Sequence, residues 1–290
     1  MISIILLLLF IFSALSVPVC KGVLSGLYLF GLKVFPGLFI SFILTNYLIR
    51  ILREKHIYNP WIILLAGIMT GFPNGAYLCA FYRQINPEST LPDKLSGIIN
   101  IPSPAFLISY VYTYILEKNI SIVLFLSVTY LPVLLIAVIT VLTSSKGINN
   151  IYKNKAARIE RHKLLTFFEE SVDASVDTAL KLGTYIILFS VIVSVISYLP
   201  LDSLIITLLT YPLEISNGLN LIKQLDISLS IRLMAVFFLD AFGGICIIMQ
   251  TKCVCREYIS IKKYIYRKLE LCALTEAVAL FLIYVLKNVS

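Results

Sequence analysis

Charged residues are scarce in this chain of 290 residues, and their scarcity excludes a soluble globular fold. Only 14% of the residues are Asp, Glu, Lys or Arg, whereas 59% are hydrophobic and the mean hydropathy is +0.93. Soluble domains carry roughly 25% charged residues, because a surface in water needs polar groups. The apolar residues also form long runs without charge, such as Met1–Cys20 and Asn119–Ser145. Runs of that length predict helices that cross a bilayer, which takes about 20 residues.

Signatures of catalysis and metal binding are also missing. Only two histidines occur, His56 and His162, and the chain contains no P-loop, no His-Glu-x-x-His and no Gly-x-Ser-x-Gly motif. Cys253 and Cys255 have no second cysteine pair or histidine cluster to complete a zinc site. We therefore predict no catalytic residue, no metal and no cofactor. Two acids that face each other across one cavity would instead favour an intramembrane enzyme.

The charge that is present has an excess of one sign, with 24 Lys and Arg against 16 Asp and Glu and a formal net charge of +8. The basic residues concentrate in the segments 50–55, 144–170 and 252–268. Lys and Arg accumulate in the cytoplasmic loops of membrane proteins, where they also face anionic lipid. We therefore predict that these segments are cytoplasmic and contact membrane lipid, and that nucleic acid is not a partner. An even number of membrane crossings must then separate one segment from the next.

Two apolar segments are interrupted by residues that break helices. Trp61–Phe81 contains Gly71-Phe72-Pro73-Asn74-Gly75, and Leu201–Ile222 contains Pro212 followed by Glu214-Ile215-Ser216-Asn217-Gly218. Lipid cannot satisfy the backbone groups that such breaks release, so breaks are tolerated where they face protein or a water-filled cavity. We interpret both segments as re-entrant hairpins, which also gives the even number of crossings.

The two halves of the sequence repeat these features in the same order. Leu32-Lys33 and Leu180-Lys181 each open an apolar helix, and a broken segment with Asn-Gly follows each of them. A further interruption follows each broken segment, at Asn100-Ile101-Pro102-Ser103-Pro104 and at Phe242-Gly243-Gly244. Paired discontinuous helices in inverted repeats are typical of secondary transporters. The prediction is one all-α polytopic membrane domain, 1–290, with a first repeat 21–143, a basic cytoplasmic loop 144–170, a second repeat 171–251, and a basic loop with the last span 252–290.

The helix breaks supply the polar groups of a predicted binding site for a small-molecule solute. Glu214, Ser216 and Asn217 offer a carboxylate, a hydroxyl and an amide within one helical turn. The first break would expose N–H groups at the start of a half-helix, where the positive end of the helix dipole favours an anion. The predicted substrate-binding residues are Gly71, Pro73, Asn74, Gly75, Asn100, Ser103, Pro104, Glu214, Ser216, Asn217, Gly243, Gly244 and Gln250.

Asp240 is an acid inside the apolar segment Leu229–Gln250. A charged residue at the centre of a membrane helix costs roughly 2.5–3.5 kcal/mol on the insertion scale, which predicts a cavity or a partner for this side chain. We take Asp240 as the candidate for coupling transport to a proton, with Na⁺ as the alternative coupling ion. A structural Asp that bonds to a neighbouring helix is the other interpretation.

These motifs, in this order, resemble the nucleoside-recognition (Gate) domain superfamily, and most closely the sporulation integral membrane protein YlbJ type. The residues that carry the resemblance are Phe35-Pro36-Gly37-Leu38-Phe39, Gly71 to Ala76, Asn100 to Pro104, Glu214 to Gly218, Phe242-Gly243-Gly244 to Gln250, Tyr264 and Lys268. The resemblance implies a fold related to concentrative nucleoside transporters and a place in the cell membrane, namely the outer forespore membrane. It also implies a role in sporulation, moving a small anionic solute such as dipicolinate.

The sequence thus predicts a multi-pass transporter or permease of a small polar, anionic metabolite, without predicting an oligomeric state. The alternative is a non-transporting membrane scaffold or assembly factor for formation of the spore envelope. The discontinuous polar hairpins discriminate between the two, because a scaffold does not need them.

Overall fold

The computed structural model describes residues 15–57, 59–144 and 161–289, together with three isolated positions before them. Every regular element in these ranges is a helix, which confirms the predicted all-α class. Within the described residues, the helices long and apolar enough to cross a membrane are Ser16–Val34, Leu91–Ile115, Ile122–Ser144, His162–Tyr198 and Leu229–Cys255. The chain thus has the helices of a polytopic membrane protein. Much of the predicted span Met1–Cys20 and of the basic loop 144–170 lies outside the described residues.

The first half of the described chain begins with one long helix and ends with another. Its elements are α2 (Ser16–Tyr28), the π-helix η1 (Leu29–Val34), α3 (Phe35–Glu54), α4 (Pro60–Thr70), α5 (Asn74–Ile85), α6 (Leu91–Ile99), α7 (Pro104–Phe106), the π-helix η2 (Leu107–Ile115) and α8 (Ile122–Ser144). Because α2, η1 and α3 are continuous, Leu32-Lys33 lies inside a helix, whereas we predicted that it opens one.

The second half repeats the alternation of long and interrupted helices. Its elements are α9 (Arg161–Tyr198), α10 (Ser203–Thr210), α11 (Ile215–Gln224), α12 (Leu229–Phe242), α13 (Gly244–Cys255) and α14 (Ile261–Val289). Gly243 separates α12 from α13 with a φ of +85°, a left-handed conformation that glycine adopts readily. Because α13 ends at Cys255 and α14 begins at Ile261, most of the basic segment 252–268 is helical.

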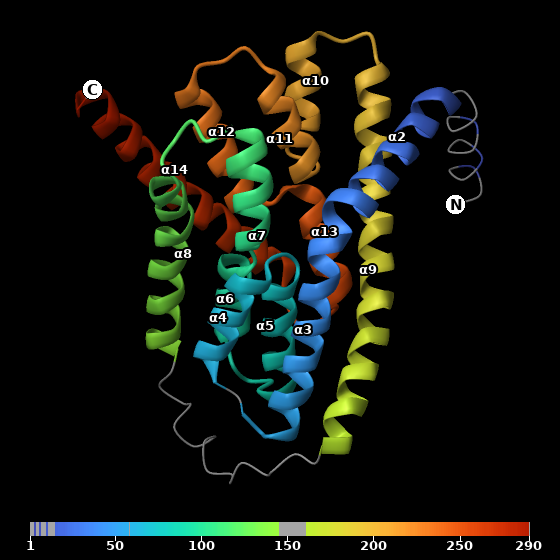
Figure 1. The fold of residues 1–290 in the computed structure, drawn as a ribbon, viewed down its shortest axis with the longest axis vertical. Helices are drawn as coiled ribbons and strands as arrows, with labels where there is room; N and C mark the ends of the chain where they lie inside the picture. Colours follow the sequence, from blue (N-terminus) through green and yellow to red (C-terminus); the bar gives the residue numbers. More distant parts are fainter. Residues whose placement is uncertain are drawn as a thin grey trace.

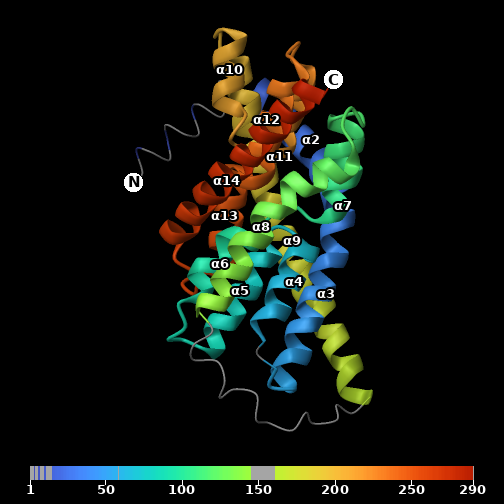
Figure 2. The ribbon, with the colours of Figure 1, turned by 90° about the vertical axis from the view of Figure 1, so that its left-hand side faces the viewer.

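Helices stop at both of the interrupted apolar segments. The first stops at Thr70 and resumes at Asn74, and the second stops at Thr210 and resumes at Ile215. The resulting short helices lie toward opposite ends of the molecule, with α4 and α5 in the lower half of Figure 1 and α10 and α11 in the upper half. Figure 2 shows the same separation from the side. The long helices α3 and α9 run beside each other along the molecule.

The outer face of the helices is apolar, as contact with lipid requires. On α8, the side chains of Leu131, Leu135, Ile139 and Leu142 are all exposed. The interior is apolar as well, and its largest fully buried aromatic side chains are those of Tyr82, Tyr264, Phe42, Phe81, Phe125 and Phe237. In water, so much exposed apolar area would favour association or membrane insertion. The exposed apolar surface therefore indicates a membrane protein, as the lengths of the helices do.

Ion pairs connect basic segments that are far apart in the sequence. Lys163 Nζ lies 2.6 Å from Glu54 Oε1, which joins the start of α9 to the end of α3. Asp93, at the start of α6, pairs with Arg83 at 2.8 Å and with Lys263 on α14 at 3.0 Å. These contacts hold the ends of several helices together. The cytoplasmic location of the basic segments stays a prediction.

Candidate functional site

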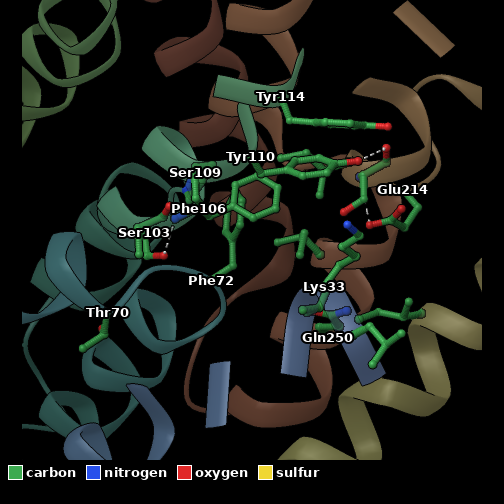
Figure 3. A pocket seen from close by; sticks show the side chains of 18 residues that line it. Lys33, Thr70, Phe72, Ser103, Phe106, Ser109, Tyr110, Tyr114, Glu214 and Gln250 are labelled. Atoms are coloured by element: carbon green, nitrogen blue, oxygen red, sulfur yellow. Dashed lines mark hydrogen bonds between the residues drawn. The ribbon is translucent and has the colours of Figure 1, made fainter. Parts of the chain in front are cut away.

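The interrupted helices surround a pocket of about 480 Å³ (Figure 3). Its lining side chains come from η1, from the end of α4 and the break after it, from the break after α6, and from α7 and η2. In the second half they come from α9, from the start of α11 and from α13. The polar lining residues are Lys33, Thr70, Ser103, Ser109, Tyr110, Tyr114, Glu214, Ser216 and Gln250. Segments from both halves of the sequence therefore converge on one pocket.

Three aromatic side chains on α7 and η2 form one wall of the pocket. The ring centroids of Phe106 and Tyr110 lie 5.1 Å apart, and those of Tyr110 and Tyr114 lie 5.6 Å apart. The Tyr110 hydroxyl donates to the carbonyl oxygen of Ser216 at 3.2 Å, which ties η2 to the start of α11. Lys223 Nζ lies 3.9 Å from the ring centroid of Tyr114. This aromatic wall gives a solute a flat apolar surface with fixed geometry.

Lys33 and Glu214 bring opposite charges to the pocket. Glu214 caps α11, because its Oε1 accepts from the N–H of Ser216 at 3.1 Å and its Oε2 from that of Asn217 at 2.8 Å. Only 3% of Glu214 is exposed. The ammonium of Lys33 lies 5.9 Å from the ring centroid of Tyr114, and Figure 3 shows the side chain pointing toward Glu214. Among the described lining residues, Lys33 is the one with a cationic side chain, which can attract an anion.

The structure divides the predicted substrate-binding residues into two groups. Ser103, Glu214, Ser216 and Gln250 line the pocket. The other predicted residues lie at the breaks but outside the pocket lining, namely Gly71, Pro73, Asn74, Gly75, Asn100, Pro104, Asn217, Gly243 and Gly244. A role of either group in solute binding stays a prediction.

Backbone groups at the first break bond within the protein. The carbonyl oxygen of Gly71 accepts from the N–H of Asn74 at 2.8 Å and from that of Gly75 at 3.3 Å, and Asn100 Oδ1 accepts from Ala76 N–H at 3.3 Å. The N–H groups that we expected to receive an anion therefore already have acceptors. Gly71 has a φ of +75°, and a Cβ on it would lie 2.5 Å from the nitrogen of Ser103. Glycine thus allows the break after α4 to touch the break after α6.

Backbone groups at the second break bond in the same way to the neighbouring interrupted helix. The N–H of Ile245 donates to the carbonyl oxygen of Pro212 at 2.9 Å, and the N–H of Cys246 donates to that of Leu213 at 2.8 Å. Both donors belong to the start of α13, where helical N–H groups have no partner within their own helix. Each interrupted helix therefore satisfies backbone groups of the break beside it.

The two asparagines at the breaks make matching contacts. Asn74 Nδ2 donates to Ser41 Oγ on α3 at 3.2 Å. Asn217 Nδ2 donates to Ser190 Oγ on α9 at 3.4 Å. In each half, the start of the second short helix is therefore held to the preceding long helix by an amide–hydroxyl hydrogen bond.

Asp240 does not line the pocket. It lies beside a small gap that is also bordered by Thr129 and Thr275, and only 1% of it is exposed. Neither carboxylate oxygen has a hydrogen-bond partner among the residues that the structure describes. Burying a charge without a hydrogen-bond partner costs free energy, so this position is unusual for an acid. Its role as the coupling residue stays a prediction.

The sequence interpretation missed several residues of the pocket. Lys33 is a lone charge in an apolar stretch, and an ionisable residue inside a membrane segment signals a functional site. Phe106, Tyr110 and Tyr114 recur every fourth residue, which places them on one side of a helix. These signals were present in the sequence. The position of Phe72 in the same pocket could not be predicted, because it depends on how the break after α4 folds.

The fold and the pocket together define an all-helical membrane protein with a polar pocket at interrupted helices. The chain is 26% identical, over 270 aligned residues, to the sporulation integral membrane protein YlbJ of Bacillus subtilis (strain 168). The match covers 76% of this chain and 66% of that protein, so the chain spans just under two thirds of the relative's length. This distant relationship supports the predicted likeness to the YlbJ type and the location in a membrane.

No family model matches the chain, and no solved structure matches it.

Proposed function

We propose that the chain is a multi-pass membrane transporter or permease of a small polar, anionic metabolite. The observation that carries the proposal is the 480 Å³ pocket bordered by helix breaks from both halves of the chain. Broken helices at membrane depth are tolerated where they border protein or a solute path, and transporters place their sites there. A scaffold needs neither the pocket nor the discontinuous helices around it.

The proposed architecture is an inverted repeat with two re-entrant hairpins, α4–α5 and α10–α11. The position of these pairs toward opposite ends of the molecule supports it (Figure 1). The matching hydrogen bonds of Asn74 and Asn217 to the preceding long helices support it as well. An interrupted helix follows each pair, α6–α7 in one half and α12–α13 in the other. This is the arrangement that we expect of the nucleoside-recognition (Gate) domain superfamily and of concentrative nucleoside transporters.

The proposed solute has an anionic group that binds Lys33 and a flat part that rests on the aromatic wall. Ser103, Ser109 and Gln250 supply further hydrogen-bonding groups around the same space. Such a lining suits a dipicolinate-like cargo. The name of the relative supports a role in sporulation, and we propose that the protein acts in the outer forespore membrane.

Uptake into proteoliposomes tests the transport proposal. We expect labelled dipicolinate to accumulate in liposomes that contain the purified protein and a labelled nucleoside to stay outside. Lys33→Met should reduce dipicolinate uptake about tenfold or more, because a hydrogen bond to a charged group contributes about 1.5–3 kcal/mol. Lys21→Met, which removes an exposed lysine of α2, is the matched control and should leave uptake unchanged.

A second outcome would favour the scaffold or assembly factor. Neither compound would then enter above the level of empty liposomes, while deletion of the gene would still block formation of the spore envelope. Uptake of the nucleoside in place of dipicolinate would support the proposed transport activity and identify a nucleoside as the cargo.

We further propose that Asp240 couples transport to a proton. Asp240→Asn keeps the shape of the side chain and removes its ability to lose a proton. The variant should bind the solute and lose the dependence of its accumulation on a proton gradient, which is measured by imposing pH steps across the liposome membrane. Unchanged dependence on the proton gradient would mean that Asp240 has a structural role. Uptake that requires a Na⁺ gradient would mean that Na⁺, and not the proton, is the coupling ion.

A further inference from the structure

Lys268 on α14 is a buried lysine that contacts both interrupted helices. None of its surface is exposed, although it belongs to a strongly basic segment of the sequence. Its Nζ donates to the carbonyl oxygen of Asn100, at the end of α6, and to that of Ala241, near the end of α12, at 2.8 Å. Nζ also lies 4.9 Å from the ring centroid of Phe72, in the break after α4. One ammonium group thus touches three of the chain's interruptions.

The two carbonyl groups are available to the ammonium because of the helix breaks. In a continuous helix, the carbonyl oxygen of Asn100 would accept from the residue four positions later, which is Pro104 and has no N–H. The equivalent donor for Ala241 is the N–H of Ile245, which instead donates to Pro212. Carbonyl groups at helix ends carry the negative end of the helix dipole and favour a cation.

The surroundings of Lys268 are those of a cation site rather than of an ion pair. Within the described part of the chain, no carboxylate lies close enough to its Nζ to form a salt bridge. The Asn100 side chain is itself fixed, because its Nδ2 donates to Tyr264 OH at 2.9 Å and to Thr251 Oγ1 at 3.1 Å. Carbonyl groups at half-helix ends coordinate Na⁺ in transporters, and an aromatic face adds attraction for a cation.

We propose that the Lys268 ammonium is a tethered cation that occupies a monovalent-cation site between the two interrupted helices. The site would otherwise take a small cation such as Na⁺ or a primary alkylammonium ion. The tether makes the junction of α6–α7 with α12–α13 independent of cations in solution. This inference does not depend on transport, since it concerns what holds the two helices together.

Chemical rescue of a truncated side chain tests the inference. Lys268→Ala removes the ammonium and its stem and should lower the melting temperature of the detergent-purified protein by roughly 5 °C or more, because it leaves two buried carbonyl groups without a donor. Ethylammonium chloride, and more weakly NaCl, should recover part of that loss, whereas choline chloride at equal ionic strength should not. Wild type should show no such cation selectivity. Lys262→Ala, which truncates an exposed lysine on the same helix, should behave as wild type.

Two results would overturn the inference. The first is a Lys268→Ala protein that is as stable as wild type. The second is a destabilised protein whose melting temperature responds equally to ethylammonium, Na⁺ and choline, since Lys268 would then act through packing alone. If Lys268→Ala does not accumulate, Lys268→Met decides the question, because it keeps the stem and removes the charge. Wild-type stability of Lys268→Met overturns the inference, and a lowered melting temperature supports it.

Discussion

The two breaks between short helices differ in where their caps come from. At the second break, the Glu214 carboxylate accepts from the N–H groups of Ser216 and Asn217, at the start of its own helix. At the first break, Pro73 precedes α5 and provides no side-chain cap, and the side chain that accepts from Ala76 is that of Asn100 on the next interrupted helix. The side-chain cap of the second break is therefore local, whereas that of the first break comes from another element. Backbone hydrogen bonds from α13 to Pro212 and Leu213 join the second break to its neighbour as well.

This difference determines how far a change at each break should spread. A local cap keeps its geometry when neighbouring helices shift, so the start of α11 can stay folded while the pocket around Glu214 changes shape. A cap supplied by another element requires both elements to stay in register. Because Asn100 also bonds to Thr251 and Tyr264, changes at the first break should reach α13 and α14.

The largest effect should follow Gly71→Ala, which changes the first break, where the side-chain cap comes from another element. The added Cβ would lie 2.5 Å from the nitrogen of Ser103, at a φ of +75° that side chains rarely adopt. Strain and overpacking together should cost about 3 kcal/mol or more, and little folded protein should reach the membrane. Quantitative blots of membrane fractions measure this. Gly31→Ala is the control, since a Cβ there has nothing within 4 Å and abundance should stay at the wild-type level.

Asn100→Ala should have the next largest effect, because it removes the side-chain cap that the first break receives from another element. It leaves the N–H of Ala76 without its acceptor and removes the donor to Tyr264, and each unsatisfied buried group costs about 1–3 kcal/mol. Thermal unfolding should therefore begin several degrees lower than in wild type. Hydrogen exchange should rise in α5 and α14 together. Exchange that rises in α5 alone would contradict the proposed spread between elements.

Local signals in the sequence predicted the breaks but not the contacts between them. Gly71, Pro73 and Pro212 interrupt helices through their own backbone properties, so the segments that contain them could be recognised without a structure. The contacts of Lys33 and Lys268 could not be predicted in this way. The sequence shows Lys33 only as a lone charge in an apolar stretch, and Lys268 only as part of a basic segment. Their positions depend on residues far away in the sequence, the aromatic wall for Lys33 and two orphaned carbonyl groups for Lys268.

The two asparagines should behave alike when they are changed, because they make the same kind of contact in both halves. Asn74→Ala and Asn217→Ala each remove one amide–hydroxyl hydrogen bond, worth about 1 kcal/mol, so both proteins should reach the membrane at near wild-type levels. Uptake should nevertheless fall strongly in both, because each hydrogen bond fixes the helix start that follows a break lining the pocket, at Phe72 in one half and at Glu214 in the other. Matched losses of uptake and of abundance would indicate a packing role for both residues.

The smallest effect on stability should follow Glu214→Gln, which changes the local cap. Glutamine keeps one oxygen that can accept from Ser216 or Asn217, so the cost should be about 1 kcal/mol or less.

The same substitution removes the negative charge from a pocket in which Lys33 carries the positive one. Loss of the repulsion between Glu214 and an anionic solute should lower the KM for dipicolinate roughly twofold to tenfold, as charges several ångströms apart interact by about 0.5–2 kcal/mol near a protein surface. Concentration-dependent uptake into proteoliposomes measures the KM, and Glu88→Gln, which neutralises an exposed acid outside the pocket lining, is the control. A raised KM in Glu214→Gln would mean that the carboxylate binds the solute directly and that its capping role is secondary.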